Sequence, residues 1–192
     1  MIKYEKGTPG YLREKLKIEI LRTVVYFAIV IAVFLLGYSQ THSKKNLLTV
    51  VAVVGCLPAC KALVGVIMRI PYKTVDPALP DEIGTKAPHL TVIYDLVVTS
   101  TEKIMPIDCM VISHQKVYGY TTGKKADLQE TAAYLRKMLR QNDFPEVSVK
   151  MYDQYKQFLS IVEGLENIAA VEKADTKEEE GQIAHVIMNL SL

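Results

Sequence analysis

The chain has 192 residues, of which 49% are hydrophobic and 23% charged, and its formal net charge is +2. A chain of this length has room for about one ordinary domain and a small appendage. Residues 1–70 hold ten lysines and arginines against three acidic residues, a net of +7, whereas residues 71–192 hold thirteen against eighteen, a net of −5. The acidic second part counts against a nucleic acid as its main partner, because such binding depends on a basic surface.

The first segment, residues 1–22, is basic and carries a helical pattern. Turn residues at positions 7–10 are followed by Leu12, Leu16 and Ile20 among charged residues. This pattern predicts an amphipathic juxtamembrane helix that lies at the lipid headgroups. A longer helix that projects from the membrane fits the same pattern.

Two apolar segments follow, at residues 23–41 and 47–69. The first contains no charged residue, and the second contains only Lys61 before Arg69 at its end. A membrane-spanning helix needs about 20 mostly apolar residues, so residues 23–70 predict a transmembrane hairpin in the lipid bilayer. A secretory signal peptide would require a small-residue cleavage site after the first segment, and no Ala-x-Ala pattern follows it.

The basic residues around these segments predict the orientation of the chain. Six lysines and arginines precede the first span, two lie in the loop between the spans, and Arg69 and Lys73 follow the second span. Lysine and arginine are enriched on the cytoplasmic side of membrane proteins. We therefore expect a multi-pass protein of the cell membrane, with the N terminus and everything after Pro71 in the cytoplasm.

Lys61 is the one charge inside the second span, and three interpretations of it are open. Its ammonium group could extend toward the cytoplasmic headgroups, contact another protein, or serve in transport. An ionised lysine at the centre of a bilayer costs roughly 2.5–3.5 kcal/mol by insertion scales, and neither span contains an acidic residue to neutralise it. Lys61 is therefore a candidate functional residue of the membrane part.

Pro58 is the second candidate in this span. A proline inside a helix removes a backbone donor and kinks the helix, which frees a carbonyl group. Gly55, Ala59 and Ala62 are small enough for another helix to approach closely. That helix could be the first span, a second copy of the chain in a homo-oligomer, or another membrane protein.

The remaining residues divide into a linker and a domain. Residues 71–88 hold four of the eight prolines and no apolar periodicity, so they predict a Pro-rich linker. Residues 89–192 predict a cytoplasmic α/β domain, in which "HLTVIYDLVVTS", "IMPIDCMVIS" and "KVYGYTT" form three antiparallel strands. Helix, strand and helix patterns follow, then a short edge strand at "NIAAVEK" and a last helix, which gives the order βββαβα(β)α.

The cysteines and histidines do not form a recognisable site. Three cysteines and four histidines are too dispersed for a disulfide framework or a zinc site. These residues therefore predict no metal and no cofactor.

Asp95 and Asp108 form the one arrangement with catalytic character. They lie in the first two predicted strands, and carboxylates on adjacent strands can hold a divalent metal for phosphodiester hydrolysis. The alternative is that both carboxylates accept hydrogen bonds from backbone groups of the sheet.

The stretch "YDLVVTSTEKIMPIDCM" resembles the nuclease-related branch of the restriction-endonuclease-like fold. In that branch an Asp is followed by a hairpin and then by an acidic residue, any residue and a lysine. The resemblance covers roughly residues 90–152 and implies metal-dependent hydrolysis. Met110 stands at the lysine position, so Lys116 or Lys103 would have to replace the lysine.

From the first span to the C terminus, the chain is also similar to a group of small bacterial proteins with two spans and a cytoplasmic tail. Stretches such as "HLTVIYDLVVTSTEKIMPIDCMVIS" and "VSVKMYDQYKQFL" carry this similarity. Some members are labelled "O-linked GlcNAc transferase-like", which would imply sugar transfer. The sequence has no helical repeat array, no glycine-rich turn before a helix and no DxD motif for that chemistry.

Three functions follow from these patterns. The leading prediction is a membrane-anchored, non-enzymatic module that binds or scaffolds an unknown cytoplasmic protein, because the sequence shows no complete catalytic constellation. The alternative is a membrane-tethered, metal-dependent hydrolase that uses Asp95 and Asp108. The third is an accessory subunit of a transporter or channel, in which Lys61 would be essential.

Overall fold

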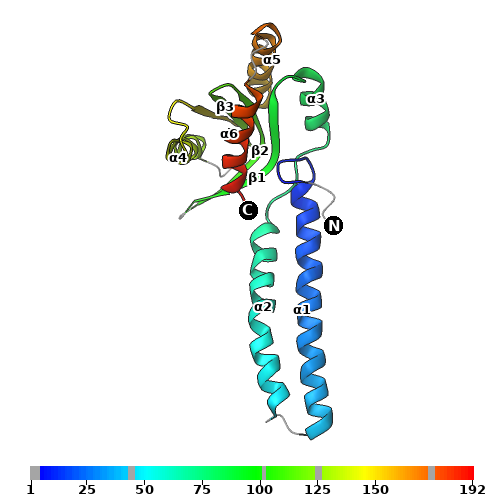
Figure 1. Ribbon diagram of the computed structural model, residues 1–192. Coiled ribbons are helices and arrows are strands. Elements are labelled where there is room, and N and C mark those ends of the chain that lie inside the picture. The colour runs from blue at the N-terminus through cyan, green and yellow to red at the C-terminus, as the bar shows by residue number, and fades with distance from the viewer. Residues whose placement is uncertain (1–4, 43–45, 101–102, 124–126, 173–175) are drawn as a thin grey trace. The chain divides into compact units, whose positions relative to one another are not determined.

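The computed structural model describes residues 5–42, 46–100, 103–123, 127–172 and 176–192. The chain divides into two compact units. One contains Leu12–Lys73, and the other contains Thr74–Leu192 together with the N-terminal segment that ends at Tyr11. The architecture is mixed α/β: two long apolar helices come first, and a four-stranded mixed sheet with helices follows (Figure 1).

Helices α1 (Tyr11–Thr41) and α2 (Leu47–Arg69) form the first unit. Both are long and apolar enough to span a membrane. The predicted amphipathic segment and the first span are one continuous helix from Tyr11 onward.

The small residues of α2 pack against α1. Ala59 is fully buried, and Ala52, Ala62 and Val66 are nearly so. At Gly55, an added Cβ would lie 3.2 Å from Cγ2 of Val30 on α1. The small residues of α2 therefore contact α1 of the same chain. This is the face that was also considered for contact with a second copy.

The second unit contains a four-stranded sheet. Its strands are β1 (Thr91–Thr99), β2 (Ile104–Ser113), β3 (Lys116–Tyr120) and β4 (Ser148–Tyr152), in the order β1-β2-β3-β4. The first two pairs are antiparallel, and β3 and β4 are parallel. Helix α4 (Leu128–Gln141) makes the connection that a parallel pair requires. The predicted βββαβ order is confirmed.

Two predicted segments have a different structure. "NIAAVEK", predicted as an edge strand, begins inside helix α5 (Tyr155–Glu172), because Leu165 and Ala169 continue the apolar stripe of that helix at a spacing of four. Residues 71–88, predicted as a linker, contain helix α3 (Ala78–Lys86). Ile83 of α3 is fully buried, so this segment belongs to the core.

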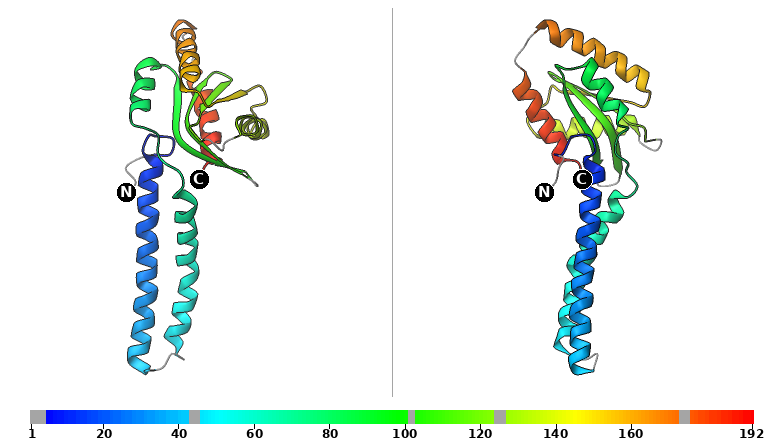
Figure 2. Two further views of the ribbon diagram at one scale, coloured as in Figure 1. Left: turned by 180° about the vertical axis from the view of Figure 1, so that it is seen from behind. Right: turned by 90° about the vertical axis from the view of Figure 1, so that its right-hand side faces the viewer.

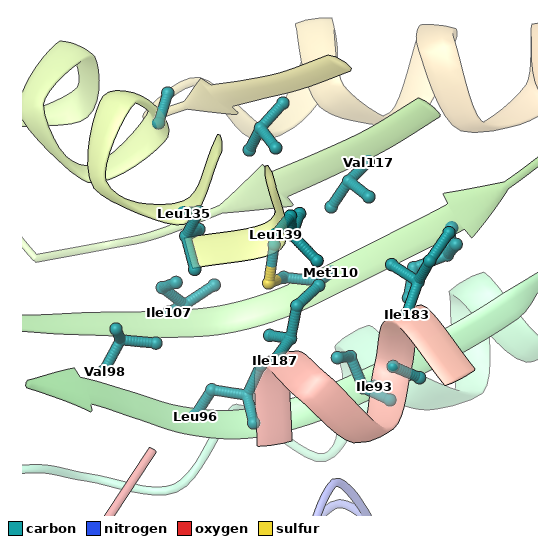
Figure 3. Packing of buried hydrophobic residues seen from close by; sticks show 14 of the residues in the cluster. Ile93, Leu96, Val98, Ile107, Met110, Val117, Leu135, Leu139, Ile183 and Ile187 are labelled. Carbon is teal, nitrogen blue, oxygen red and sulfur yellow. The ribbon is translucent and has the colours of Figure 1, made fainter. Parts of the chain in front are cut away.

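Helices cover both faces of the sheet (Figures 1 and 2). Helix α4 and the last helix, α6 (Lys177–Asn189), pack on one face. Figure 3 shows Leu135 and Leu139 of α4 and Ile183 and Ile187 of α6 against strand residues there. Helices α3 and α5 pack on the other face through Ile83, Phe158 and Val162. The second unit therefore has three layers, α/β/α.

Segments from the N-terminal and C-terminal parts of the second unit cover the free edge of β1. Backbone N–H groups of Tyr94 and Leu192 donate to Gly7 (2.8 Å) and Val97 (2.9 Å) respectively. Ser191 forms an isolated antiparallel bridge with Val98. An exposed strand edge invites pairing with other chains, and these segments occupy it.

The fold predicts that two residues of α5 contribute very differently to the free energy of unfolding. Phe158 is fully buried, whereas Val171 is 81% exposed. We expect Phe158→Ala to lower the free energy of unfolding by about 3–5 kcal/mol, because it removes a large core side chain. Val171→Ala should change it by less than about 0.5 kcal/mol. Urea unfolding of the full chain in detergent, followed by tyrosine fluorescence, measures both, and equal losses would contradict this core assignment.

Candidate functional site

Asp95 lies in the middle of β1 and is 2% exposed. Its neighbours Tyr94 and Leu96 pair with Cys109 and Ile107, so Asp95 lies opposite Asp108. The structure therefore places the two sequence-predicted carboxylates at the same level of adjacent strands. The backbone of Asp95 has φ +53°, a left-handed conformation that is uncommon outside glycine.

Both oxygens of the Asp95 carboxylate accept hydrogen bonds. Oδ2 accepts from the backbone N–H of Gly10 at 2.8 Å and from the hydroxyl of Thr74. Oδ1 accepts from the backbone N–H of Val75 at 2.8 Å. We call Asp95, Gly10, Thr74 and Val75 the Asp95 cluster. Three donors therefore satisfy both oxygens of this buried carboxylate, as a buried polar group requires.

The segment before α1 packs closely against the rest of the second unit. Gly7 has φ +87°, and an added Cβ there would lie 2.7 Å from Sδ of Met188 on α6. Lys6 donates from Nζ to the carbonyl of Ser191 at 2.7 Å. This segment is therefore an integral part of the α/β unit.

The left-handed backbone of Asp95 coincides with a change in the direction of side chains. Ile93 and Leu96 both belong to the core cluster under α4 and α6, although they are three residues apart. In a regular strand, residues an odd number apart point to opposite faces. The same change occurs in β2, where Ile107 and Met110 share that cluster. The side chains of both strands therefore change faces at the same level, and the pairing of the two strands keeps its register.

Asp108 is half-buried and also has a structural partner. Its Oδ2 accepts from the backbone N–H of Thr122, in the segment that follows β3. Each of the two predicted carboxylates therefore binds chain segments of the fold.

The predicted lysines do not join the two carboxylates. Lys116 is exposed and pairs with Ser113, whereas Cys109, next to Asp108, pairs with Tyr120. Four residues of strand, about 13 Å, separate these levels. Lys103 forms an ion pair with Glu130. Within the described ranges, the structure contains no group of three or more His, Cys, Asp or Glu side chains that could hold a metal ion.

A second buried carboxylate, Glu180 of α6, was not singled out from the sequence as a buried residue. It is 3% exposed and accepts from the Thr91 hydroxyl at 2.6 Å and from the His114 N–H at 3.0 Å. It thus attaches α6 to β1 and to the turn between β2 and β3. Three glutamates follow one another at 178–180, and the sequence did not indicate which of them is buried.

Tyrosines and a cysteine line the face under α3 and α5. Burial raises the pKa of Cys109 well above its ordinary value of 9.0, so the residue remains a thiol rather than a nucleophilic thiolate. Burial also raises the pKa of Tyr94 and of Tyr120. This face is therefore a neutral core layer.

In the first unit, Lys61 and Pro58 are both exposed on α2. Cys60 is exposed and Cys56 is half-buried. Ala59, which is fully buried, lies nearly opposite Lys61 on the helix. The two membrane candidates therefore do not contribute to the packing of α2 on α1.

No protein-family model, no curated protein and no solved structure matches this chain. Its geometry therefore carries the functional argument.

Replacing the Asp95 carboxylate should release the segments that it binds. In Asp95→Asn, an NH₂ group replaces one carboxylate oxygen and faces one of the backbone N–H donors. The donor then lacks an acceptor, so the free energy of unfolding should fall by about 1–3 kcal/mol. We expect faster hydrogen exchange at the amides of Gly10 and Val75. Glu180→Gln is the matched control, because it perturbs another buried carboxylate with different partners. Unchanged exchange at Gly10 and Val75 in Asp95→Asn would contradict this role.

Tyr155 should set the acid response of Glu82. The Tyr155 hydroxyl donates to Glu82 at 2.6 Å and, together with Lys86, lowers the pKa of Glu82 below its ordinary 4.5. A lowered pKa means that this contribution to stability is present above pH 4.5 and is lost as the pH falls through the folded-state pKa. Tyr155→Phe should raise the pKa of Glu82 toward 4.5 in an NMR titration. Glu166, which contacts His89 instead, should be unaffected, and an unchanged Glu82 would refute the assignment.

Proposed function

We propose that this protein is a membrane-anchored binding or scaffolding module whose α/β domain holds a partner protein in the cytoplasm. The observation that carries this proposal is the apolar outer surface of α1 and α2. Leu21 and Val24 on α1, and Val53 and Leu57 on α2, are each at least 59% exposed. Large exposed apolar surfaces mark contact with a membrane or another protein, and helices of 31 and 23 residues are long enough to cross a bilayer about 30 Å thick.

The distribution of basic residues supports the cytoplasmic location. Six lysines and arginines precede the first predicted span, and only two lie between the spans. Cytoplasmic flanks of spans carry this excess. Both ends of the hairpin would then lie on the cytoplasmic side, together with the α/β domain.

The chemistry of the α/β unit favours binding over hydrolysis. A metal at Asp95 would have to displace three hydrogen-bond donors from a carboxylate that is 2% exposed. Lys116 lies several residues along the sheet from the level of Asp108. The Asp95 carboxylate instead accepts hydrogen bonds from donors that belong to the α/β unit itself.

Protease accessibility tests the anchoring and the orientation. We expect alkaline carbonate to leave the chain in the membrane, and proteinase K to digest residues 74–192 in inside-out vesicles only. Right-side-out vesicles are the control. Extraction by carbonate would refute the anchor, and digestion in right-side-out vesicles alone would refute the orientation. Manganese-dependent phosphodiester cleavage that is lost in Asp108→Ala, with the fold retained, would support the hydrolase in place of the scaffold.

A further inference from the structure

Lys61 lies on the side of α2 that is turned away from α1. With about 100° between successive helical residues, Lys61 falls nearly opposite Ala59 and Val66, which are buried against α1. It shares its side with exposed apolar residues: Val54, Leu57, Val64 and Met68. Within the described part of the chain, Lys61 has no hydrogen bond or ion pair.

The depth of Lys61 places its charge inside the hydrocarbon. Helix α2 has 23 residues with Pro58 at its midpoint, so Lys61 lies about 4–5 Å from the middle of the helix axis. The nearer boundary of a hydrocarbon layer about 30 Å thick is then about 10 Å away. An extended lysine side chain reaches only about 6 Å beyond its Cα, given bonds of about 1.5 Å.

The direction of the side chain adds to this shortfall. In an α-helix, each Cα–Cβ bond points toward the N-terminus of the helix. The boundary nearer to Lys61 lies toward the C-terminal end, at Arg69. The side chain would therefore have to reverse its preferred direction to approach the headgroups, and its ammonium group needs a polar partner at its own depth.

The chain itself contains no acidic partner at that depth. Residues 20–75 include no aspartate or glutamate. The nearest acidic residue before them, Glu19, is 12% exposed and lies beside Gly65 in the packing of α1 on α2. A second copy would bring another Lys61 to this surface and no carboxylate at this depth. The partner of this surface is therefore more consistent with a different protein.

Pro58 supplies a second polar feature on the same side. Because proline has no backbone N–H, the carbonyl of Val54, four residues earlier, loses its helical donor. Val54 and Lys61 are seven residues apart, which places them on one stripe of the helix. A donor and an acceptor therefore lie on an otherwise apolar surface that is free of α1.

We propose that this surface of α2 binds a transmembrane helix of another protein, and that an aspartate or glutamate near the middle of that helix pairs with Lys61. The inference rests on the proposed function, since it requires α2 to span a membrane. The inference extends the proposed function by naming a class of partner within the bilayer: a transmembrane helix with an acidic residue.

The test uses the full chain in lipid vesicles and a synthetic leucine–alanine transmembrane peptide with a single central aspartate as the probe. Resonance energy transfer between labelled chain and labelled peptide measures their association. We expect the aspartate peptide to bind the natural chain, and Lys61→Leu to weaken this association about tenfold, as for polar contacts between model membrane helices. Lys61→Arg should retain it, and Val64→Leu, a neutral change on the same surface, should leave it unchanged.

A matched peptide with leucine in place of the aspartate separates charge pairing from apolar contact. Equal binding of the two peptides, or equal binding of the aspartate peptide to the natural chain and to Lys61→Leu, would overturn the inference. Self-association that depends on Lys61 would assign the surface to a second copy and overturn it as well. Failure of the chain to insert would overturn the proposed function together with this inference, whereas insertion without aspartate-dependent binding would overturn the inference alone.

Discussion

The hydrogen-bonded carboxylate of Asp95 is the interaction on which the α/β unit depends most. It binds Gly10 from the segment before α1, and Thr74 and Val75 from the segment after α2. A buried carboxylate is costly unless it is fully hydrogen-bonded, so these segments are as necessary to Asp95 as Asp95 is to them. The left-handed backbone at this residue is part of the same arrangement, because it coincides with the common shift of β1 and β2. Strained backbone of this kind persists only where its surroundings determine it.

Much of the fold could be predicted because each of its layers has a distinct apolar period. The continuous apolar run of β1 and the alternation of β4 both correspond to the observed burial. "NIAAVEK" was predicted incorrectly because its apolar residues suit a strand as well as a helix, and only the stripe from Phe158 to Ala169 decides between them. Helix α3 was missed because a nine-residue helix with one fully buried apolar residue, Ile83, shows no readable period.

The candidate site shows a different limit. The sequence singled out Asp95 and Asp108 as two carboxylates on neighbouring strands, and the structure places them opposite one another. It did not indicate their partners, since Gly10 and Val75 lie 85 and 20 residues from Asp95. Hydrogen bonds to backbone N–H groups depend on no side-chain type at the donor, so no pattern of residue types reports them. The glycines at 7 and 10 were visible as turn residues, but the sequence did not show that Gly7 lies against Met188 or that Gly10 donates to Asp95.

The attachment of the N-terminal segment makes the α/β unit discontinuous: the helical hairpin is an insertion within it. During synthesis, residues 5–10 emerge first, whereas Asp95 follows much later and Ser191, the acceptor of Lys6, lies 185 residues downstream. Contacts so distant in sequence form late, because the entropy of closing the loop opposes them. The edge of β1 is covered by Leu192, whose backbone N–H donates to the carbonyl of Val97. The helical hairpin is therefore synthesised before the α/β unit can close, because Lys6 and Val97 find these partners only after Ser191 and Leu192 have been made.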